Sequence, residues 1–491
     1  TSDLTSVNAE TLSAQAQGTG ANSCVFSGWT AYAASNSNLC SSLTSGNGNV
    51  VMLTEDTTWS GDVTIDGKVV VDNDVTLTIE PGTVIKAVAK ADPTLASALV
   101  VAKGGKLMAE GTANLPIVFT TSIDPLTAAD VAAGTYFSSS FSLDLRGQWG
   151  GLVLLGDNVV GANDGTATIE GIGAGNDWAV YGGNKTDDNS GVLKYISIRH
   201  GGATVSAGNE INGLTLGGVG NGTIIENIEI ISNNDDGIEL FGGNVDVTNI
   251  LIYNQIDDAI DIDQAYSGTI TNAYVAMGID SDNVFEIDGT ENTTTGSYTI
   301  DGVTAIGKTG QTQTDQYGHW KSSATGANNN IVFKDFASGT VIEGMDSNFA
   351  AGTLTFSNID FVTTDNLADI TSDLTSANAE VLSAQAAGTG STEDHFYSWT
   401  AYFVSGEGVL SVEDTEVIKT EFSIYPNPFS NILNVSTQVK VDVLRLYNIT
   451  GQLVKANKNS NSIDVSELSK GMYILEVITD SDREVKKVIK K

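Results

Sequence analysis

The stretch that decides the fold is DDGIEL at residues 235–240, which recurs as DDAIDI at 257–262 and as DNVFEI at 282–287. A second short element precedes each copy, as ENIEI at 226–230, TNILI at 248–252 and TNAYV at 271–275. The first two copies of each element start 22 residues apart. Two short alternating runs per period are typical of a coiled stack of strands. We therefore predict an all-β chain built mainly as a right-handed parallel β-helix.

Alternation within each run assigns an inward face. Aliphatic residues at equivalent positions should stack from one turn to the next, and each one buried contributes roughly 1.5–3 kcal/mol. The expected columns are Ile228, Ile250 and Ala273; Ile230, Ile252 and Val275; Ile238, Ile260 and Phe285; and Leu240, Ile262 and Ile287. Asn227, Asn249 and Asn272 align at a strand start, where stacked amides can hydrogen-bond up the ladder. These asparagines are interpreted as structural.

Acidic residues fall in register beside the inward columns. Glu239, Asp261 and Glu286 alternate with the inward aliphatics and should face outward on one sheet. The remaining members are Asp263 and Asp288, which extend that face, and Asp235, Asp257 and Asp282, which are expected at the preceding corner. Neighbouring strands lie about 4.8 Å apart, and like charges at that spacing repel by about 1 kcal/mol in water and a few at an effective dielectric near 20. A solvated ladder tolerates this repulsion, but a covered one needs a cation.

Calcium is the cation that this pattern favours, because hard cations bind carboxylate and carbonyl oxygens. The candidate ligands are Asp235, Asp257, Asp261, Asp263, Asp282, Glu286 and Asp288. A solvated acidic face is the alternative, since no dedicated calcium-loop motif is present. Glu239, Asp261 and Glu286 are also candidate acid–base residues for glycoside cleavage. No Arg or Lys is in sequence reach of this face, since Arg199 comes two turns before it and Lys308 follows it. We therefore favour a non-catalytic ladder.

The composition and charge of the chain limit the classes of molecule that it is expected to bind. The 491 residues carry a net charge of −37. Residues 1–420 hold 52 acids and 13 bases, whereas residues 421–491 hold 8 acids and 10 bases, which marks a domain boundary. The acidic part should repel nucleic acid and anionic membranes and attract cations, although the charge could merely keep the chain soluble. No run approaches the roughly 18 apolar residues of a membrane span, so we expect no transmembrane segment. Cys24 and Cys40 form either a disulfide or two free thiols.

Other catalytic signatures are missing from the sequence. The histidines are not spaced as metal ligands, and there is no phosphate loop, zinc motif or nucleophile elbow. Five aromatic residues fall in the longer loops, namely Trp178, Tyr181, Tyr266, Tyr317 and Trp320. They could stack on sugar rings, although packing against the coil is the commoner outcome.

A long internal repeat suggests several modules. Residues 1–20 match residues 371–390 at all but three positions, and the same offset of 370 relates Trp29-Thr30-Ala31-Tyr32 to Trp399-Thr400-Ala401-Tyr402. We expect a precursor with at least one more module upstream, unless only this segment was copied. The predicted domains are a preceding-repeat or capping segment (1–45), the β-helix (46–369), a duplicated cap over the stack end (370–403), a linker (404–420) and a small Ig-like β-sandwich (421–491).

The last segment carries the most specific motifs. These are Tyr425-Pro426-Asn427-Pro428, a turn at Gly451, Lys470-Gly471-x-Tyr473 and a basic tail that includes Lys490 and Lys491. In this order they resemble the type A C-terminal sorting domain of the type IX secretion system of Bacteroidota. The resemblance implies a translocon and a sortase as partners, and an extracellular or outer-membrane surface location.

Together these features predict a secreted or cell-surface β-helix protein. We expect a non-enzymatic, adhesin-like structural role, stiffened by calcium and multimodular, with surface polysaccharide or other copies of the chain as further partners. The alternative is a secreted polysaccharide lyase or glycoside hydrolase that uses the acidic outer face.

Overall fold

The computed structural model divides the chain into two compact units, residues 1–409 and 410–491. The structure describes residues 43–45, 50–172, 175–203, 211–308, 317–321, 323–344, 352–363, 365, 367–371, 382, 386–407, 423–425, 428–436, 440–448, 453–458, 460–479 and 483–491. The predicted disulfide residues Cys24 and Cys40 lie outside these ranges, as do Pro426, Asn427 and Gly451 of the sorting motif. The described part has no helix long and apolar enough to span a membrane.

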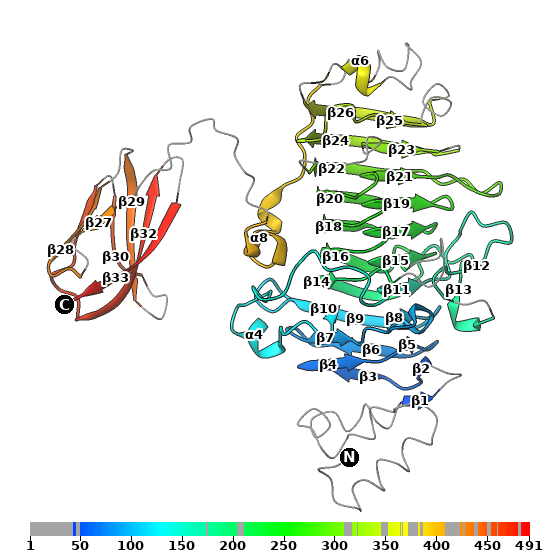
Figure 1. Ribbon diagram of the computed structural model, residues 1–491, viewed down its shortest axis with the longest axis horizontal. Helices are drawn as coiled ribbons and strands as arrows, with labels where there is room; N and C mark the ends of the chain where they lie inside the picture. The colour runs from blue at the N-terminus through cyan, green and yellow to red at the C-terminus, as the bar shows by residue number, and fades with distance from the viewer. Residues whose placement is uncertain are drawn as a thin grey trace, which may run out of the picture. The chain divides into compact units, whose positions relative to one another are not determined.

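The first unit is a stack of parallel strands, which confirms the predicted parallel β-helix (Figure 1). One sheet, sheet A, runs in the order β1 (Leu43–Ser45), β2 (Val50–Leu53), β5 (Lys68–Val71), β8 (Ala98–Val101), β11 (Leu152–Leu155), β15 (Leu214–Gly217), β17 (Ile238–Phe241), β19 (Ile260–Asp263), β21 (Phe285–Ile287), β23 (Gly318–Trp320) and β25 (Ile342–Glu343). Only β1 pairs antiparallel in this sheet.

The second sheet, sheet B, contains longer strands. Its main path is β26 (Leu354–Val362), β24 (Gly326–Lys334), β22 (Tyr298–Ile306), β20 (Thr269–Ala276), β18 (Val247–Tyr253), β16 (Ile224–Ile231), β14 (Gly191–Arg199), β10 (Ile117–Thr121), β7 (Val84–Ala87) and β4 (Asp62–Ile65), with β3 (Thr57–Trp59), β6 (Thr76–Ile79) and β9 (Lys106–Glu110) beside it. A short helix, α4 (Ala128–Ala132), interrupts the strands within the Ala-rich stretch of the sequence.

Strand register confirms the inward columns. Ile238 lies opposite Ile260, which lies opposite Phe285, and the other three predicted columns align in the same way. None of the twelve side chains is more than 1% exposed. They form one continuous apolar core along the coil, so the period-2 pattern of each rung correctly identified the core.

The asparagine ladder is present, but it lies inside β16, β18 and β20 rather than at a strand start. Asn227, Asn249 and Asn272 have φ angles of 59°, 58° and 62°, which bend each strand through the left-handed region that asparagine tolerates. Asn249 donates to Asn227 at 3.0 Å, and Asn272 donates to Asn249 at 2.6 Å. Each amide therefore supports the bend of the neighbouring turn.

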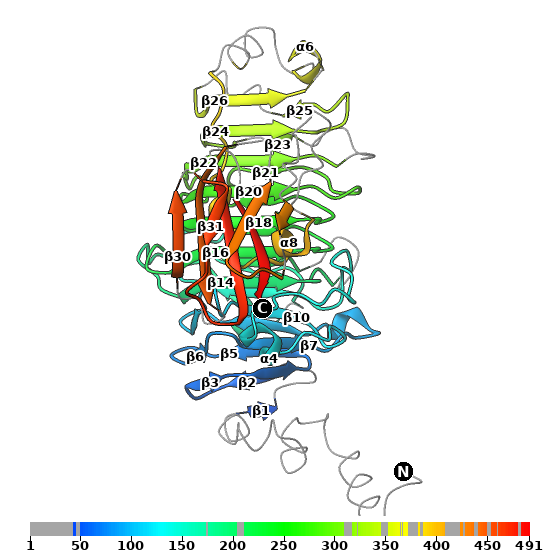
Figure 2. The same ribbon diagram turned by 90° about the vertical axis from the view of Figure 1, so that its left-hand side faces the viewer.

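The predicted cap segment over the stack end, residues 370–403, is described only in part. Ile370 and Leu382 join the core of the coil. The later residues instead run along the outer face of sheet B, through η4 (Glu393–His395) and α8 (Ala401–Ser405). Figures 1 and 2 both place α8 beside β16 and β18. This face needs cover because its outward residues Leu251 and Tyr274 are apolar or aromatic.

The second unit is the predicted small β-sandwich of antiparallel strands. One sheet contains β27 (Ser423–Tyr425), β28 (Ile432–Ser436) and β31 (Ser462–Asp464), and the other contains β30 (Leu453–Lys458), β29 (Val441–Asn448), β32 (Gly471–Thr479) and β33 (Arg483–Lys490). Phe429, Leu444 and Leu475 are fully buried between them.

Candidate functional site

An outward column of acidic residues runs across sheet A. Glu239 on β17 is the register partner of Asp261 on β19, which is the partner of Glu286 on β21. The same column continues from Glu286 to His319 on β23. These positions alternate with the buried aliphatics, so the three predicted acids share one face, as expected for a period of two.

A second acidic column lies at the corner before sheet A. Asp236 Oδ1 accepts a hydrogen bond from the backbone N–H of Asp258 at 2.9 Å, and Asp258 Oδ1 accepts one from Asn283 N–H at 2.8 Å. One turn earlier, Asn212 Oδ1 accepts from Asp236 N–H at 3.2 Å. Each corner carboxylate thus caps the next turn. Asp236 and Asp258 were not among the predicted site residues, because adjacent acids at a corner look like ordinary turn residues.

The two columns meet. Among the residues that the structure describes, four groups of three carboxylates have oxygen atoms within 4.8 Å of one another. The groups are Asp235, Asp236 and Asp257; Asp236, Glu239 and Asp261; Asp257, Asp258 and Asp282; and Asp258, Asp261 and Glu286. We call these eight residues the acidic ladder. Asp261 belongs to two groups and links the corner column to the outward column.

Part of the acidic ladder is covered rather than solvated. Asp236 and Glu239 are each 6% exposed and Asp258 is 2% exposed. An excursion between β11 and β14 approaches from outside, and its Glu170 lies within hydrogen-bonding reach of Glu239. Asn212 Nδ2 donates to Glu239 and, at 3.3 Å, to Glu170. Glu170 was missed because it precedes the repeated rungs and carries no periodic signal.

The excursion is itself anchored on sheet A. It contains β12 (Ala167–Thr168), η3 (Asp177–Ala179) and β13 (Val180–Tyr181), which lie to one side of the coil in Figure 1. Its apolar residues, including Ile169 and Tyr181, pack against Val153 and Phe241 of the sheet. This packing holds Glu170 over the ladder.

Burial and neighbouring charge raise the pKa of the central acids. Desolvation is the largest cause for Asp236, Glu239, Asp258 and Asp261, and nearby carboxylates add to it. The Oδ1 atom of Asp261 is buried and has no hydrogen-bonding partner among the described residues. The ladder therefore concentrates negative charge that protons or a cation must neutralise.

Within the described part of the chain one base reaches the ladder, although the sequence spacing predicted no Arg or Lys within reach of this face. Lys321 follows β23 and forms an ion pair with Glu286. Burial alone would lower the pKa of Lys321, but Glu286 and the carboxylates of Asp261 and Asp288 raise it overall. Arg199 lies on sheet B, where it is 3.6 Å from Glu229, and Lys308 is exposed beyond β22. The turn that separates β21 from β23 is long, so the sequence spacing did not reveal Lys321.

Two predicted ligands lie apart from the carboxylate groups. Asp263 Oδ1 accepts a hydrogen bond from Gln264 N–H at 2.5 Å, and Asp288 Oδ1 accepts one from Gly289 N–H at 2.8 Å. Burial raises the pKa of Asp263 to about 6. Asp263 is the last residue of β19 and Asp288 follows the end of β21, and neither belongs to the four groups found among the described residues.

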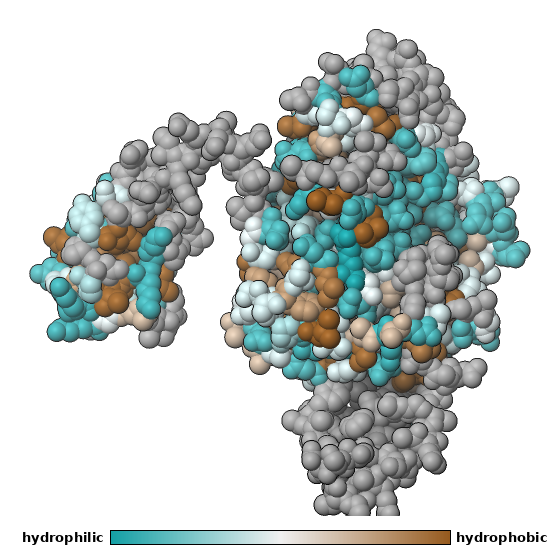
Figure 3. Space-filling model, viewed as in Figure 1, coloured by the Kyte–Doolittle hydropathy of each residue, from teal (hydrophilic) through white to brown (hydrophobic). Residues whose placement is uncertain are grey.

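The loop aromatics offer no broad stacking surface. Tyr181, Tyr266, Tyr317 and Trp320 are each 1% exposed, and Trp178 is packed against the apolar cluster of the excursion. On the face shown in Figure 3, hydrophilic residues cover much of the middle of the coil and hydrophobic ones form small separate groups. The aromatics therefore stabilise the coil.

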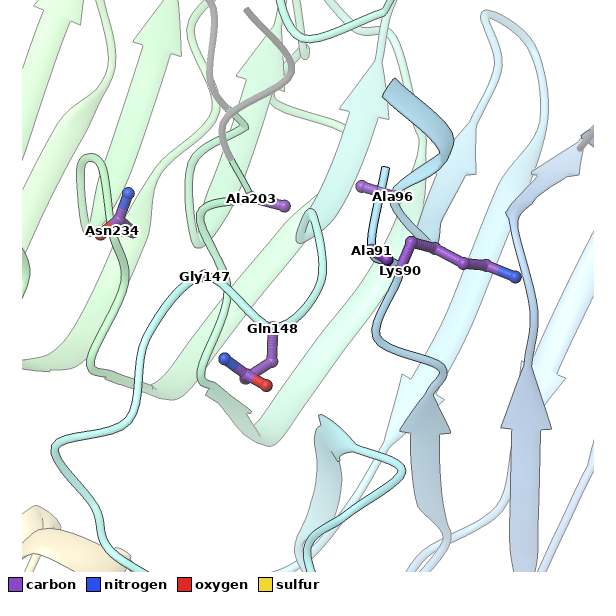
Figure 4. A pocket seen from close by; sticks show the side chains of 7 residues that line it. All are labelled: Lys90, Ala91, Ala96, Gly147, Gln148, Ala203 and Asn234. Carbon is purple, nitrogen blue, oxygen red and sulfur yellow. The ribbon is translucent and has the colours of Figure 1, made fainter. Parts of the chain in front are cut away.

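A cavity of about 300 Å³ is lined by none of the eight residues of the acidic ladder, although Asn234 in its wall precedes Asp235 in the chain. Its lining includes Lys90, Gln148 and Asn234, and Figure 4 shows that the Lys90 and Gln148 side chains do not converge. Lys90 is engaged in an ion pair with Asp66. We therefore place the candidate site at the ladder rather than in this cavity.

The described sorting-motif residues lie on the second unit. Tyr425 is 52% exposed at the end of β27. Tyr473 is 8% exposed, and its hydroxyl donates to the backbone oxygen of Ser469 at 2.8 Å. Lys470 and Gly471 are exposed where β32 begins. The tyrosine thus ties the turn at Lys470 to the sandwich.

Comparisons with known proteins agree with both units. Residues 50–404 match the family described as a pectate-lyase like beta helix domain, and residues 423–491 match a secretion system C-terminal sorting domain. A solved structure that resembles the chain is the Acinetobacter phage vB_ApiP_P1 tailspike protein, at 10% identity and a TM-score of 0.28, covering 89% of this chain and 72% of that chain. No curated protein matches.

Proposed function

The chain belongs to the pectate-lyase-like β-helix family, and we propose that it acts as a non-enzymatic, adhesin-like structural protein whose acidic ladder binds calcium. The sorting domain shows that the chain is handled by type IX secretion and exported to the cell surface or outside. To this location the proposal adds the structural, adhesin-like role and the binding of calcium. It also adds a sortase that removes the second unit, and surface polysaccharide or further copies as partners.

The observation that carries the calcium proposal is the covered junction at Asp261. Its buried Oδ1 lacks a hydrogen-bonding partner among the described residues, while oxygens of Asp236, Glu239, Asp258 and Glu286 lie within 4.8 Å in two groups. Calcium binds six to eight oxygens at about 2.3–2.6 Å in flexible geometry, so a modest contraction of either group would form a site. A divalent ion would also remove the like-charge repulsion that the fold otherwise carries.

The structural role is supported by the way in which the acids are used. Asp236 and Asp258 accept backbone hydrogen bonds that join successive turns, so these carboxylates maintain the stack. Glu239 is 6% exposed beneath the excursion, which leaves little room for a sugar chain in this conformation. A bound ion would then fasten the turns and the excursion together and stiffen the coil.

The second candidate function is cleavage of an acidic or neutral polysaccharide. The contact between Lys321 and Glu286 favours it, because a cation beside paired carboxylates can support acid–base chemistry. In that role Glu239, Asp261 and Glu286 would hold or move the proton.

One experiment separates the two functions. The full chain is melted with and without calcium and is incubated with a panel of polysaccharides. The structural proposal expects a calcium-dependent rise in melting temperature and no depolymerised product. Product that disappears in both Glu239→Gln and Asp261→Asn, but persists in the exposed control Asp164→Asn, would overturn it in favour of the enzyme.

A further inference from the structure

Residues 388–403 form a strap across the outer face of sheet B, and two glycines fit it to the coil. A Cβ at Gly388 would lie 2.5 Å from the carbonyl oxygens of Ile331 and Asn358. A Cβ at Gly390 would lie 2.4 Å from Thr304 Oγ1, and the φ of this residue is 67°. A side chain at either position would collide with the sheet, so only glycine lets the strap approach this closely.

Three buried aromatics anchor the strap further along. Phe396, Trp399 and Tyr402 are 0%, 1% and 5% exposed. Their ring centroids lie 6.4 Å from Tyr274, 5.5 Å from Tyr195 and 4.9 Å from Tyr253, respectively. The Thr400 hydroxyl donates to the Phe396 carbonyl oxygen at 2.8 Å and holds the turn between the anchors. We call the outward-facing residues of sheet B beneath the strap, which include Tyr195, Tyr253 and Tyr274, the flank.

Three polar contacts of the strap with sheet B use its backbone N–H groups. The N–H of Tyr402 donates to Glu229 Oε1 at 3.0 Å, and the N–H of Ser391 donates to Thr304 Oγ1 at 2.9 Å. The N–H of Thr392 donates to Asn272 Oδ1. Any residue except proline supplies this N–H, so these contacts do not depend on the side chains at positions 391 and 392.

A second segment of the chain carries the same glycines, buried anchors and turn residues as the strap. At the offset of 370, the glycines, anchors and turn residues of the strap correspond to Gly18, Gly20, Phe26, Trp29, Thr30, Ala31 and Tyr32 without a change. The differences fall at positions 21–25, 27, 28 and 33, which correspond to strap residues 391–395, 397, 398 and 403. Tyr397, for example, is 48% exposed. The two glycines and the three buried anchors are thus kept, whereas the contact of Phe403 with Tyr274 and the ion pair of Glu393 with Lys334 are not.

We propose that Gly18–Tyr32 is a second strap that binds the flank of another copy of this β-helix. The flank of each coil is covered by its own strap, so binding replaces one strap by the other. Because the anchors are identical, exchange conserves the main contacts, as in domain swapping. Tethering of coils in one assembly raises the effective concentration of the second strap. The inference depends on the proposed multimodular role in one respect only, which is that a second coil must be present for the second strap to bind.

Binding of the isolated second strap tests this directly. The receptor is the full chain carrying Trp29→Ala, Tyr32→Ala, Trp399→Ala and Tyr402→Ala, so that neither of its own straps competes. The probe is a fluorescent peptide of residues 16–34, followed by anisotropy. We expect saturable binding, displacement by an unlabelled peptide of residues 386–404, and at least about tenfold weaker binding of the Trp29→Ala peptide. Binding of 386–404 but not of 16–34, or equal binding of the Trp29→Ala peptide, would overturn the proposal.

Cross-linking provides a second measurement with intact straps. Lys334 Nζ lies 3.9 Å from Glu393 Oε1, and Cys24 corresponds to the next strap residue, Asp394. The full chain with Lys334→Cys and Cys40→Ser is refolded at high concentration and treated with a short bismaleimide. We expect covalent dimers that fall by about tenfold with Trp29→Ala. Cross-links confined to single chains, or none, would contradict docking on a second copy. Neither assay depends on calcium or on polysaccharide cleavage.

Discussion

Glu239 and Asp261 lie directly opposite one another on β17 and β19, and burial raises the pKa of both carboxyl groups. Two like charges at this spacing repel by a few kcal/mol at an effective dielectric near 20. Near neutral pH, the coil must therefore either hold a proton on one of these two carboxyl groups or bind a cation between them. The acidic ladder thus links stability, pH and calcium.

Without a divalent cation, we predict that the coil loses stability as pH rises. The unfolded carboxyl groups titrate near pH 4, whereas the folded pKa values of Asp236, Glu239, Asp258 and Asp261 are higher. Between these pH values the unfolded state releases protons first, so the free energy of unfolding decreases. Urea titrations in EDTA from pH 4 upward measure this slope. A stability that increases with pH throughout that window, once the His200 contribution described next is subtracted, would refute the prediction.

Titration of His200 should change the free energy of unfolding in the opposite direction, so that this residue favours folding more as pH rises. Burial lowers its pKa to about 4, and its Nδ1 lies 2.6 Å from the carbonyl oxygen of Leu145. The unfolded histidine titrates near 6.5, so between pH 6.5 and 4 only the unfolded state takes up the proton, and folding loses up to about 3 kcal/mol. The difference between wild type and His200→Asn isolates this effect, because asparagine tolerates the φ of 64°. An identical pH slope in the two proteins would argue against a neutral buried imidazole.

The asparagine ladder gives a stability prediction. Asn249→Ala removes hydrogen bonds to Asn227 and Asn272 and leaves a residue with φ of 58°. We expect a loss of about 2–4 kcal/mol in the free energy of unfolding. Asn249→Gly loses the same bonds but accepts the bend, so it should cost less than alanine. Chemical denaturation of both variants tests the order, and a more stable alanine variant would show that the bend is not strained.

The buried ion pair of Arg199 and Glu229, which lies beneath the strap, gives a further prediction about stability. Glu229 is fully buried and 3.6 Å from Arg199. Arg199→Met leaves the Glu229 carboxylate without its cation, so we expect a loss of about 3–5 kcal/mol. The double variant Arg199→Met, Glu229→Gln should recover part of it, because no isolated charge remains. If the double variant is at least as unstable as Arg199→Met, the electrostatic explanation fails.

The sequence predicts the coil well because the signal is periodic. Ile238, Ile260 and Phe285 repeat one alternation pattern, and each copy supports the same register. The acids beside them inherit their outward direction from that pattern. The asparagine bend was recognised as a ladder but was misplaced, since left-handed φ angles within a strand leave no hydrophobic signal.

The remainder of the site depends on contacts that do not repeat. Glu170 comes from an excursion and Lys321 from a turn of different length, so neither falls in register. The strap was expected at the stack end because a solenoid exposes apolar residues there. The outward side chains of Tyr253 and Tyr274 follow no repeated pattern, and their contacts hold the strap on the flank instead.

The most direct test of calcium binding at Asp261 is a melting comparison near neutral pH between wild type and Asp261→Asn, each in EDTA and in calcium. Calcium should raise the melting temperature of wild type, by an amount equivalent to about 2.7 kcal/mol at a hundredfold excess over the dissociation constant. Asp261→Asn should be more stable than wild type in EDTA, because one of the crowded like charges is gone, and should lose most of the calcium shift, whereas Asp164→Asn keeps it. An Asp261→Asn protein that is less stable than wild type in EDTA and retains the full calcium shift would contradict the account.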